Sequence, residues 1–246
     1  MLEDSLTVMW KEFRGMLRSS GSRWKSIAIL VTPIALFGVI FPIQFREEWL
    51  AGYWSIAVAV VTPMLLITTT IAESFAGERE RHTLETLLAS RLPDRAILLG
   101  KWFASLIFGW GMTLFLLAVS LVVVNLLEWS GQFLFYQSGI FWIDLAASLL
   151  VSGTVSSLGI LISLRAPTVQ NAAQTMMLAL FMPLLLLQAV VFLLPNFVPV
   201  ASIKARLAQL DFDTIIVIFL IFLVAANIGL FLGALARFRR SKLILS

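Results

Sequence analysis

The chain of 246 residues is 60% hydrophobic and only 13% charged, whereas a soluble domain has about 25% charged residues. This composition excludes an ordinary soluble domain and favours a protein embedded in a lipid bilayer. The net charge of +4 does not require a nucleic-acid partner, and the absence of cysteine excludes disulfides and Cys-ligated metals.

The first 25 residues precede the first long apolar run. Leu6, Met9, Trp10, Phe13 and Leu17 recur there at helical spacing, with Lys and Arg on another face. This pattern predicts an amphipathic helix at the membrane interface; a plain basic leader is the alternative. No cleavable signal peptide is expected, because the run that follows is long enough to cross a membrane.

Six stretches lack acidic and basic residues for about the 20 positions that a helix needs to cross a bilayer. They are continuous rather than alternating, which favours helices over a barrel. The predicted spans cover residues 26–45, 49–73, 97–127, 142–164, 170–194 and 214–236. The expected fold is therefore all-α, as one polytopic membrane domain over residues 1–246. Residues 195–213 are expected to leave the membrane as short external or re-entrant helices.

The distribution of Lys and Arg predicts the orientation. With six spans both termini share a side, and all 18 basic residues except Arg46, Lys204 and Arg206 fall on that side. The positive-inside rule then places both termini in the cytoplasm and the chain in the plasma (inner) membrane.

The fourth predicted span carries small residues at a spacing of three or four: Ser148, Ser152, Ser156 and Gly159. Such a stripe lets helix backbones approach closely in lipid. We expect it to pack against another helix, within the chain or between subunits, rather than to bind a ligand.

Catalytic and energy-coupling motifs are absent from the sequence. There is no zinc-protease or serine-hydrolase motif, and Gly100-Lys101 lacks the rest of a P-loop. Asp144 and Glu128 are placed by the sequence at the outer ends of the fourth and third spans, and no acidic or basic residue is expected near the middle of the bilayer. That counts against a proton- or ion-driven carrier. The chain is not expected to be an enzyme, and energy would have to enter through another chain.

One charged segment, "GERERHTLETLLAS" (Gly77–Ser90), interrupts the apolar sequence. Residues 78–90 lack Pro and Gly and pair Arg81 with Glu85 at i,i+4, which predicts a helix. Leu84, Leu87 and Leu88 form a one-sided apolar stripe. By its physical chemistry alone, this could be an interfacial helix without a partner.

The same segment resembles the signature of the ABC type-2 permeases, the membrane subunits of a class of ABC exporters. The residues that carry the resemblance are Phe75-Ala76-Gly77-Glu78, Thr83-Leu84-Glu85, Leu87-Leu88-Ala89-Ser90, Pro93 and Leu99-Gly100-Lys101. The stretch "LGILISLRAPTVQNAAQTMMLALFMPLLL" is similar to that family's connection between its fourth and fifth spans, and the N-terminal helix resembles its elbow helix. His82 departs from the pattern, which most often has glycine there, and Arg91-Leu92 intervene before Pro93.

The resemblance implies a homo- or heterodimer of permease subunits on two cytoplasmic ABC ATPase subunits, which carry ATP and Mg; no cofactor is expected on this chain. Residues 74–92 would form a coupling helix. The implied ATPase-docking residues are Gly77, Glu78, Arg81, His82, Thr83 and Glu85, and the implied attachment residues are Leu84, Leu87 and Leu88.

The favoured interpretation is the transmembrane (permease) subunit of an ABC exporter. A non-transporting membrane scaffold that recruits a cytoplasmic partner is the alternative, and a self-sufficient channel or secondary carrier is less favoured. Nothing in the sequence selects a substrate.

Overall fold

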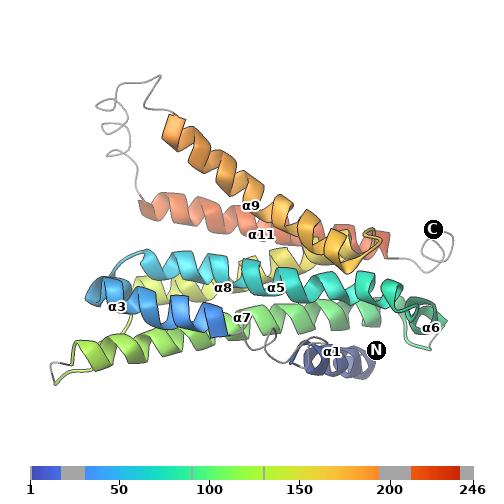
Figure 1. The fold of residues 1–246 in the computed structure, drawn as a ribbon, viewed down its shortest axis with the longest axis horizontal. Coiled ribbons are helices and arrows are strands. Elements are labelled where there is room, and N and C mark those ends of the chain that lie inside the picture. The colour runs from blue at the N-terminus through green and yellow to red at the C-terminus, as the bar shows by residue number, and fades with distance from the viewer. Residues whose placement is uncertain (1, 18–30, 90, 130, 194–211, 239–246) are drawn as a thin grey trace.

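The computed structural model describes residues 2–17, 31–89, 91–129, 131–193 and 212–238 (Figure 1), and every regular element in these ranges is a helix. The all-α prediction is confirmed for this part of the chain. The helices are α1 (Leu2–Leu17), the π-helix η1 (Ile34–Ile40), α3 (Phe41–Phe45), α4 (Glu47–Ala51), α5 (Trp54–Glu80), α6 (Leu84–Ala89), α7 (Asp94–Leu127), α8 (Ser138–Ser163), α9 (Val169–Leu193) and α11 (Phe212–Arg237).

Five of the described helices, α5, α7, α8, α9 and α11, are long and apolar enough to cross a membrane. They correspond to the second to sixth predicted spans. Of the first predicted span, residues 26–30 lie outside the described residues, and the apolar helix Val31–Phe45 is shorter than a span. The predicted external segment likewise falls mostly on residues 194–211, which are not described.

The second span begins later and extends further than predicted. Residues from Glu47 to Ala51 form the separate helix α4, which ends at Gly52 in an extended conformation, and α5 starts at Trp54. The other end of α5 continues to Glu80, so the prediction of one helix over residues 78–90 is wrong. A turn at residues 81–83 separates α5 from α6. Helical propensity did not reveal this break. The charged residues at the end of α5 belong to the membrane helix because they bind to neighbouring helices, as described below.

Helices α5, α7 and α8 form the centre of the bundle, and α5 and α8 make its most extensive helix pair. Close approach is possible because small residues face large ones. A Cβ atom at Gly109 in α7 would lie 2.3 Å from Ile67, and one at Gly159 in α8 would lie 2.3 Å from Ile71. The predicted stripe residues Ser148, Ser152, Ser156 and Gly159 are all buried.

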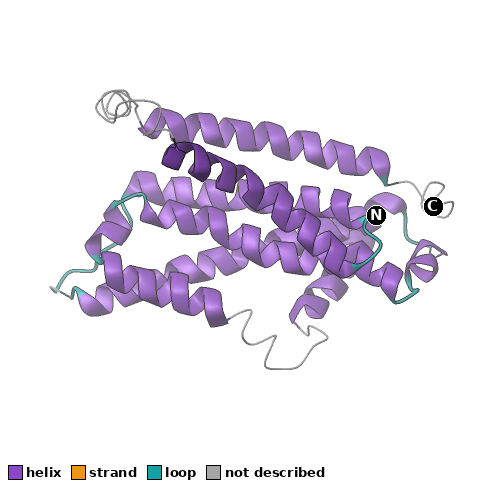
Figure 2. Cartoon of the chain, turned by 45° about the horizontal axis from the view of Figure 1, so that its top comes forward, coloured by secondary structure: helices purple, strands orange, loops and turns teal. Residues whose placement is uncertain are grey.

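Two long helices lie on one side of this centre (Figures 1 and 2). Helix α11 packs along α8, whereas α9 packs on α5 near its own start and diverges from α11 towards its other end. The short helix α1 packs on α7. We refer to the end of the bundle with α1, α6 and the last turn of α11 as the α6 end, and to the opposite end as the α4 end (Figure 1).

Candidate functional site

The chain reverses its direction immediately after α5, at the α6 end. The amide groups of Arg81, His82 and Thr83 donate to carbonyl oxygens of the last turn of α5, at 3.1, 3.0 and 2.9 Å. His82 has a φ of 55°, in the left-handed region that costs a side-chain-bearing residue about 1–2 kcal/mol. This is the position at which the ABC type-2 pattern most often has glycine, and the backbone conformation supplies the physical reason.

A buried lysine lies just inside this turn. The Lys101 side chain, near the start of α7, is only 1% exposed. Its ammonium group donates to Glu12 Oε1 at 3.0 Å, to Glu78 Oε1 at 3.0 Å and to the Ser74 carbonyl oxygen at 2.8 Å. It also lies 4.9 Å from the ring centroid of Phe75. We call Glu12, Ser74, Phe75, Glu78 and Lys101 the Lys101 junction; it joins α1, α5 and α7.

The α1 helix is held against α7 by shape as well as by charge. A Cβ atom on Gly100 would lie 2.6 Å from Val8 Cβ and 2.9 Å from the Ser5 carbonyl oxygen. Only a residue without a side chain allows this approach. By contrast Leu6 and Trp10, on the predicted lipid-facing stripe of α1, are exposed. Phe13, of the same stripe, is half-buried and packs edge-on against Phe108 of α7. Helix α1 therefore presents one face to α7 and leaves part of its apolar stripe uncovered.

The next two charged residues of α5 bind to the turn between α8 and α9. The Arg79 guanidinium donates to the carbonyl oxygens of Leu164, at 2.8 Å, and Ala166. Glu80 Oε1 accepts a hydrogen bond from the amide of Val169, the first residue of α9, at 2.9 Å. A carboxylate at this position satisfies an otherwise free amide and complements the helix dipole.

A buried serine extends the same connection. Ser163 Oγ, at the end of α8, accepts hydrogen bonds from the amides of Phe75 and Ala76 at 3.1 and 3.0 Å. Thus Glu78, Arg79 and Glu80 connect the last turn of α5 to α1, α7, the α8–α9 turn and α9. Much of the charged segment therefore holds helices of the bundle together rather than facing outwards.

The residues implied as a docking set therefore separate into two groups. Gly77 is buried against Val169, and the Glu78 side chain is 13% exposed within the Lys101 junction. Arg81, His82 and Thr83 are exposed. Arg81 lies 3.8 Å from Glu73 in a loose ion pair.

On α6, the Leu84 side chain is buried in the main hydrophobic core and Thr86 is exposed. This placement agrees with the attachment role that the resemblance implies for Leu84. The side chains of Glu85, Leu87 and Leu88 lie outside what the structure describes.

Sequence reasoning did not identify Glu12, Arg79, Glu80 or Lys101 as site residues. Lys101 was considered only as part of the permease signature and of a Gly-Lys pair that lacks the rest of a P-loop. A sequence signal was available: Lys101 is the only basic residue of α7 after its first turn, and such a cation requires a buried partner. The identity of that partner depends on tertiary packing over 89 positions of sequence.

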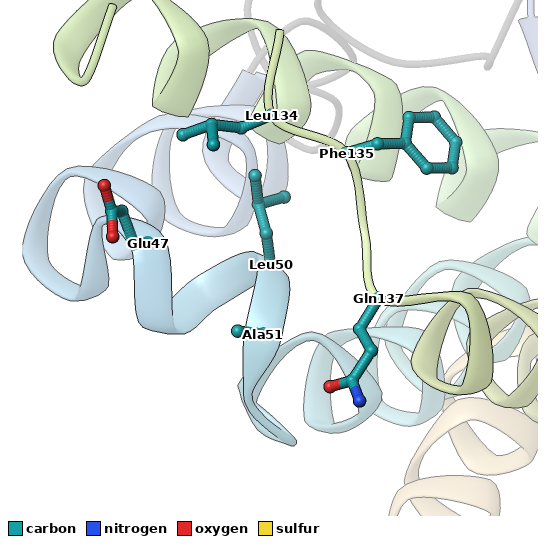
Figure 3. Close-up of a pocket in the computed structure, with 6 residues that line it drawn as sticks. All are labelled: Glu47, Leu50, Ala51, Leu134, Phe135 and Gln137. Carbon is teal, nitrogen blue, oxygen red and sulfur yellow. The ribbon is translucent and has the colours of Figure 1, made fainter. Parts of the chain in front are cut away.

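The opposite end of the bundle contains a hollow of about 270 Å³ (Figure 3). Its lining comes from two segments, α4 and the stretch before α8. The lining residues are Glu47, Leu50, Ala51, Leu134, Phe135 and Gln137.

Comparison with known proteins identifies the family. Residues 4–202 match the family model described as "ABC-2 type transporter". The chain is 25% identical over 194 residues to a protein named "ABC transporter permease protein NatB" from Bacillus subtilis (strain 168). That alignment covers 71% of this chain and 50% of the relative, so this chain spans about half of the relative's length.

The family match covers most of the chain and includes the turn after α5, the Lys101 junction and the α8–α9 turn. The chain therefore belongs to the family of ABC-2 type transporter membrane proteins.

Proposed function

We propose that this chain is the transmembrane subunit of an ABC exporter and that a separate ATPase subunit docks on the turn after α5 and on α6. The observation that carries the proposal is the arrangement at the α6 end. An exposed turn, Arg81–Thr83, directly follows three charged residues that are bonded to α1, α7 and the α8–α9 turn. A force applied at the turn would therefore act on four other helices.

This arrangement suits the transmission of an ATP-driven movement. Transmission requires an element that moves as a body and contacts that make neighbouring helices follow it. Helix α5 is one continuous helix of 27 residues that ends at the turn, and Leu84 anchors α6 in the core. Charge-assisted hydrogen bonds are the strongest of the noncovalent ties that could pull the neighbours along.

The partners and orientation follow from the same proposal. The α6 end would face the cytoplasm of the plasma membrane, because the basic residues concentrate on that side. ATP and Mg would be bound by the ATPase subunit, and a second permease subunit, identical or related, would complete the complex. The described part of this chain contributes the membrane helices and the docking turn.

The experiment that tests this proposal is reconstitution of the full chain with an ABC ATPase encoded beside it. Thr86→Arg and His82→Asp, both at exposed positions, should weaken co-purification with the ATPase and lower ATP hydrolysis by the complex at least about tenfold, the effect of roughly 1.4 kcal/mol. Gln132→Arg is the matched control, because Gln132 is also exposed but lies at the α4 end.

The outcomes distinguish the alternatives. Equal loss in all three variants, or in none, would refute docking at the turn. A stable complex whose ATP hydrolysis is coupled to no transport would favour the scaffold. Transport by the chain in vesicles without any ATPase would favour a self-sufficient carrier.

A further inference from the structure

Asp144 is buried inside the bundle rather than at the end of a span. Sequence reasoning placed it at the outer end of the fourth span, where the membrane topology alone would explain a charged residue. In the structure α8 begins at Ser138, so Asp144 lies about 9 Å along the helix. Its side chain is 1% exposed. Its burial was not anticipated from the sequence.

Neither carboxylate oxygen of Asp144 has a hydrogen-bond partner in the described structure. The Ser55 hydroxyl, in the first turn of α5, lies beside the carboxyl group, and Asp144 also interacts electrostatically with the Tyr136 hydroxyl. Tyr136 is tied elsewhere, to Ser120 Oγ at 2.7 Å and to the Leu117 carbonyl oxygen at 3.0 Å. Burial raises the pKa of Tyr136 to about 12, so that hydroxyl stays neutral.

The other charged groups at the α4 end are occupied or exposed. Arg46, between α3 and α4, pairs with Glu128 at the end of α7 at 2.8 Å. Asp213, at the start of α11, accepts a hydrogen bond from Tyr53 at 3.1 Å. Glu47, at the start of α4, is exposed. None of these groups forms an ion pair with Asp144, and no cation among the described residues neutralises it.

An isolated carboxylate in an apolar interior is so unfavourable that the group takes up a proton instead. We propose that Asp144 is a proton-binding site, which holds its proton in this closed conformation and releases it when the α4 end of the bundle opens to water. On release the carboxyl O–H bond breaks, the proton passes to a water molecule, and the Ser55 hydroxyl turns to donate to the carboxylate.

The hollow of Figure 3 provides the path to water. The two segments that line it also carry buried side chains next to the lining residues. Leu50 and Ala51 line the hollow while Trp49 is buried, and Phe135 and Gln137 line it while Tyr136 is buried. A shift of α4 away from the stretch before α8 would therefore join the hollow to the neighbourhood of Asp144.

That shift is restrained by a backbone hydrogen bond and by apolar packing. The Gln137 amide donates to the Leu50 carbonyl oxygen at 3.1 Å. Trp49 and Leu50 are buried in one apolar cluster with Tyr136. Separation of the two segments would therefore break this backbone hydrogen bond and expose part of that cluster, a cost that the ATP-driven movement proposed above would have to supply.

The test uses infrared spectroscopy of the purified full chain in lipid nanodiscs. At neutral pH exposed Asp and Glu side chains are ionised, so a carbonyl stretch from a protonated carboxyl reports a buried acid. We expect this band in the wild type, its loss in Asp144→Asn, and its persistence in Glu47→Gln, the exposed acid of the same end. Ser55→Ala should shift the band, since it removes the neighbouring hydroxyl, and it provides a second variant if Asp144→Asn does not fold.

The orientation and the opening step rest on the proposed function, but this first measurement does not, because it needs no ATPase. The second measurement repeats it on the complex trapped with a nonhydrolysable ATP analogue, where the band should weaken. Absence of the band in the wild type, its persistence in Asp144→Asn, or no change on trapping would overturn the proposal. Loss of the band on adding sodium at constant pH would also overturn it, since a metal cation rather than a proton would then neutralise the site.

Discussion

Replacement of Lys101 by methionine should destabilise the protein strongly. Methionine keeps much of the apolar stem but removes the ammonium group, which leaves Glu12 and Glu78 with no cation between them. Each carboxylate lies 3.0 Å from Lys101 Nζ, a separation at which the attraction is about 5 kcal/mol at an effective dielectric constant of about 20. Much of this is offset by desolvation, and breaking a buried pair costs about 3–5 kcal/mol net.

Lys11→Met is the matched control. Lys11 lies 3.9 Å from the same Glu78 oxygen, but its side chain is 68% exposed. Such a surface pair contributes about 0–1 kcal/mol. The comparison therefore keeps the substitution and one acidic partner constant, and contrasts a buried, multiply bonded cation with an exposed one in a looser pair.

Thermal unfolding of the purified full chain in detergent measures the difference. For a chain of this size each kcal/mol lowers Tm by about 2–4 °C, so Lys101→Met should unfold at least about 6 °C below the wild type and Lys11→Met within about 4 °C of it. Combining Glu12→Gln and Glu78→Gln with Lys101→Met should recover part of the loss, because the unpaired charges are then removed. Equal effects of the two methionine variants, or no recovery in the triple variant, would refute the reasoning about the junction.

Further predictions concern the packing and the connections at the α6 end. Gly109→Ala should lower the free energy of unfolding by about 1–3 kcal/mol, because its Cβ would lie 2.3 Å from Ile67. Gly111→Ala, whose Cβ would have nothing within 4 Å, should be neutral or stabilising in the same thermal unfolding measurement. Similar effects of the two variants would contradict the packing described. His82→Gly should raise Tm slightly, because it removes about 1 kcal/mol of left-handed strain, and an equal rise in His82→Ala would argue against that cause. Arg79→Lys should increase amide hydrogen exchange in the α8–α9 turn, since a single ammonium group does not reproduce the planar guanidinium fork that binds two carbonyl oxygens; unchanged exchange would show that the two bonds do not hold the turn.

The membrane helices were predictable because one physical constraint dominates them. A bilayer requires long apolar runs, and α7, α8, α9 and α11 begin and end within a few residues of the predicted spans. Where another constraint intervened, the boundaries moved. Gly52 separates α4 from α5, and the charged residues after residue 77 prolong α5 because they find partners on neighbouring helices.

The candidate site was less predictable because its chemistry is non-local. The charged segment was recognised from sequence, but its charges were expected to face a partner protein. In the structure Glu78, Arg79 and Glu80 bind groups that lie between 23 and 89 positions away in sequence. The burial of Asp144 was missed for a different reason: its position near the end of a predicted span was taken to explain the charge, whereas α8 begins six residues earlier, at Ser138.

The most direct test of the central claim, that energy enters at the turn after α5, is site-specific photocrosslinking in native membranes. A photoreactive amino acid at position 82 or 86 should form a crosslink to an ATP-binding protein, because both positions are exposed at the α6 end. The same amino acid at position 132, exposed at the α4 end, should form none. Crosslinks to an ATPase from position 132 but not from positions 82 and 86 would contradict the account.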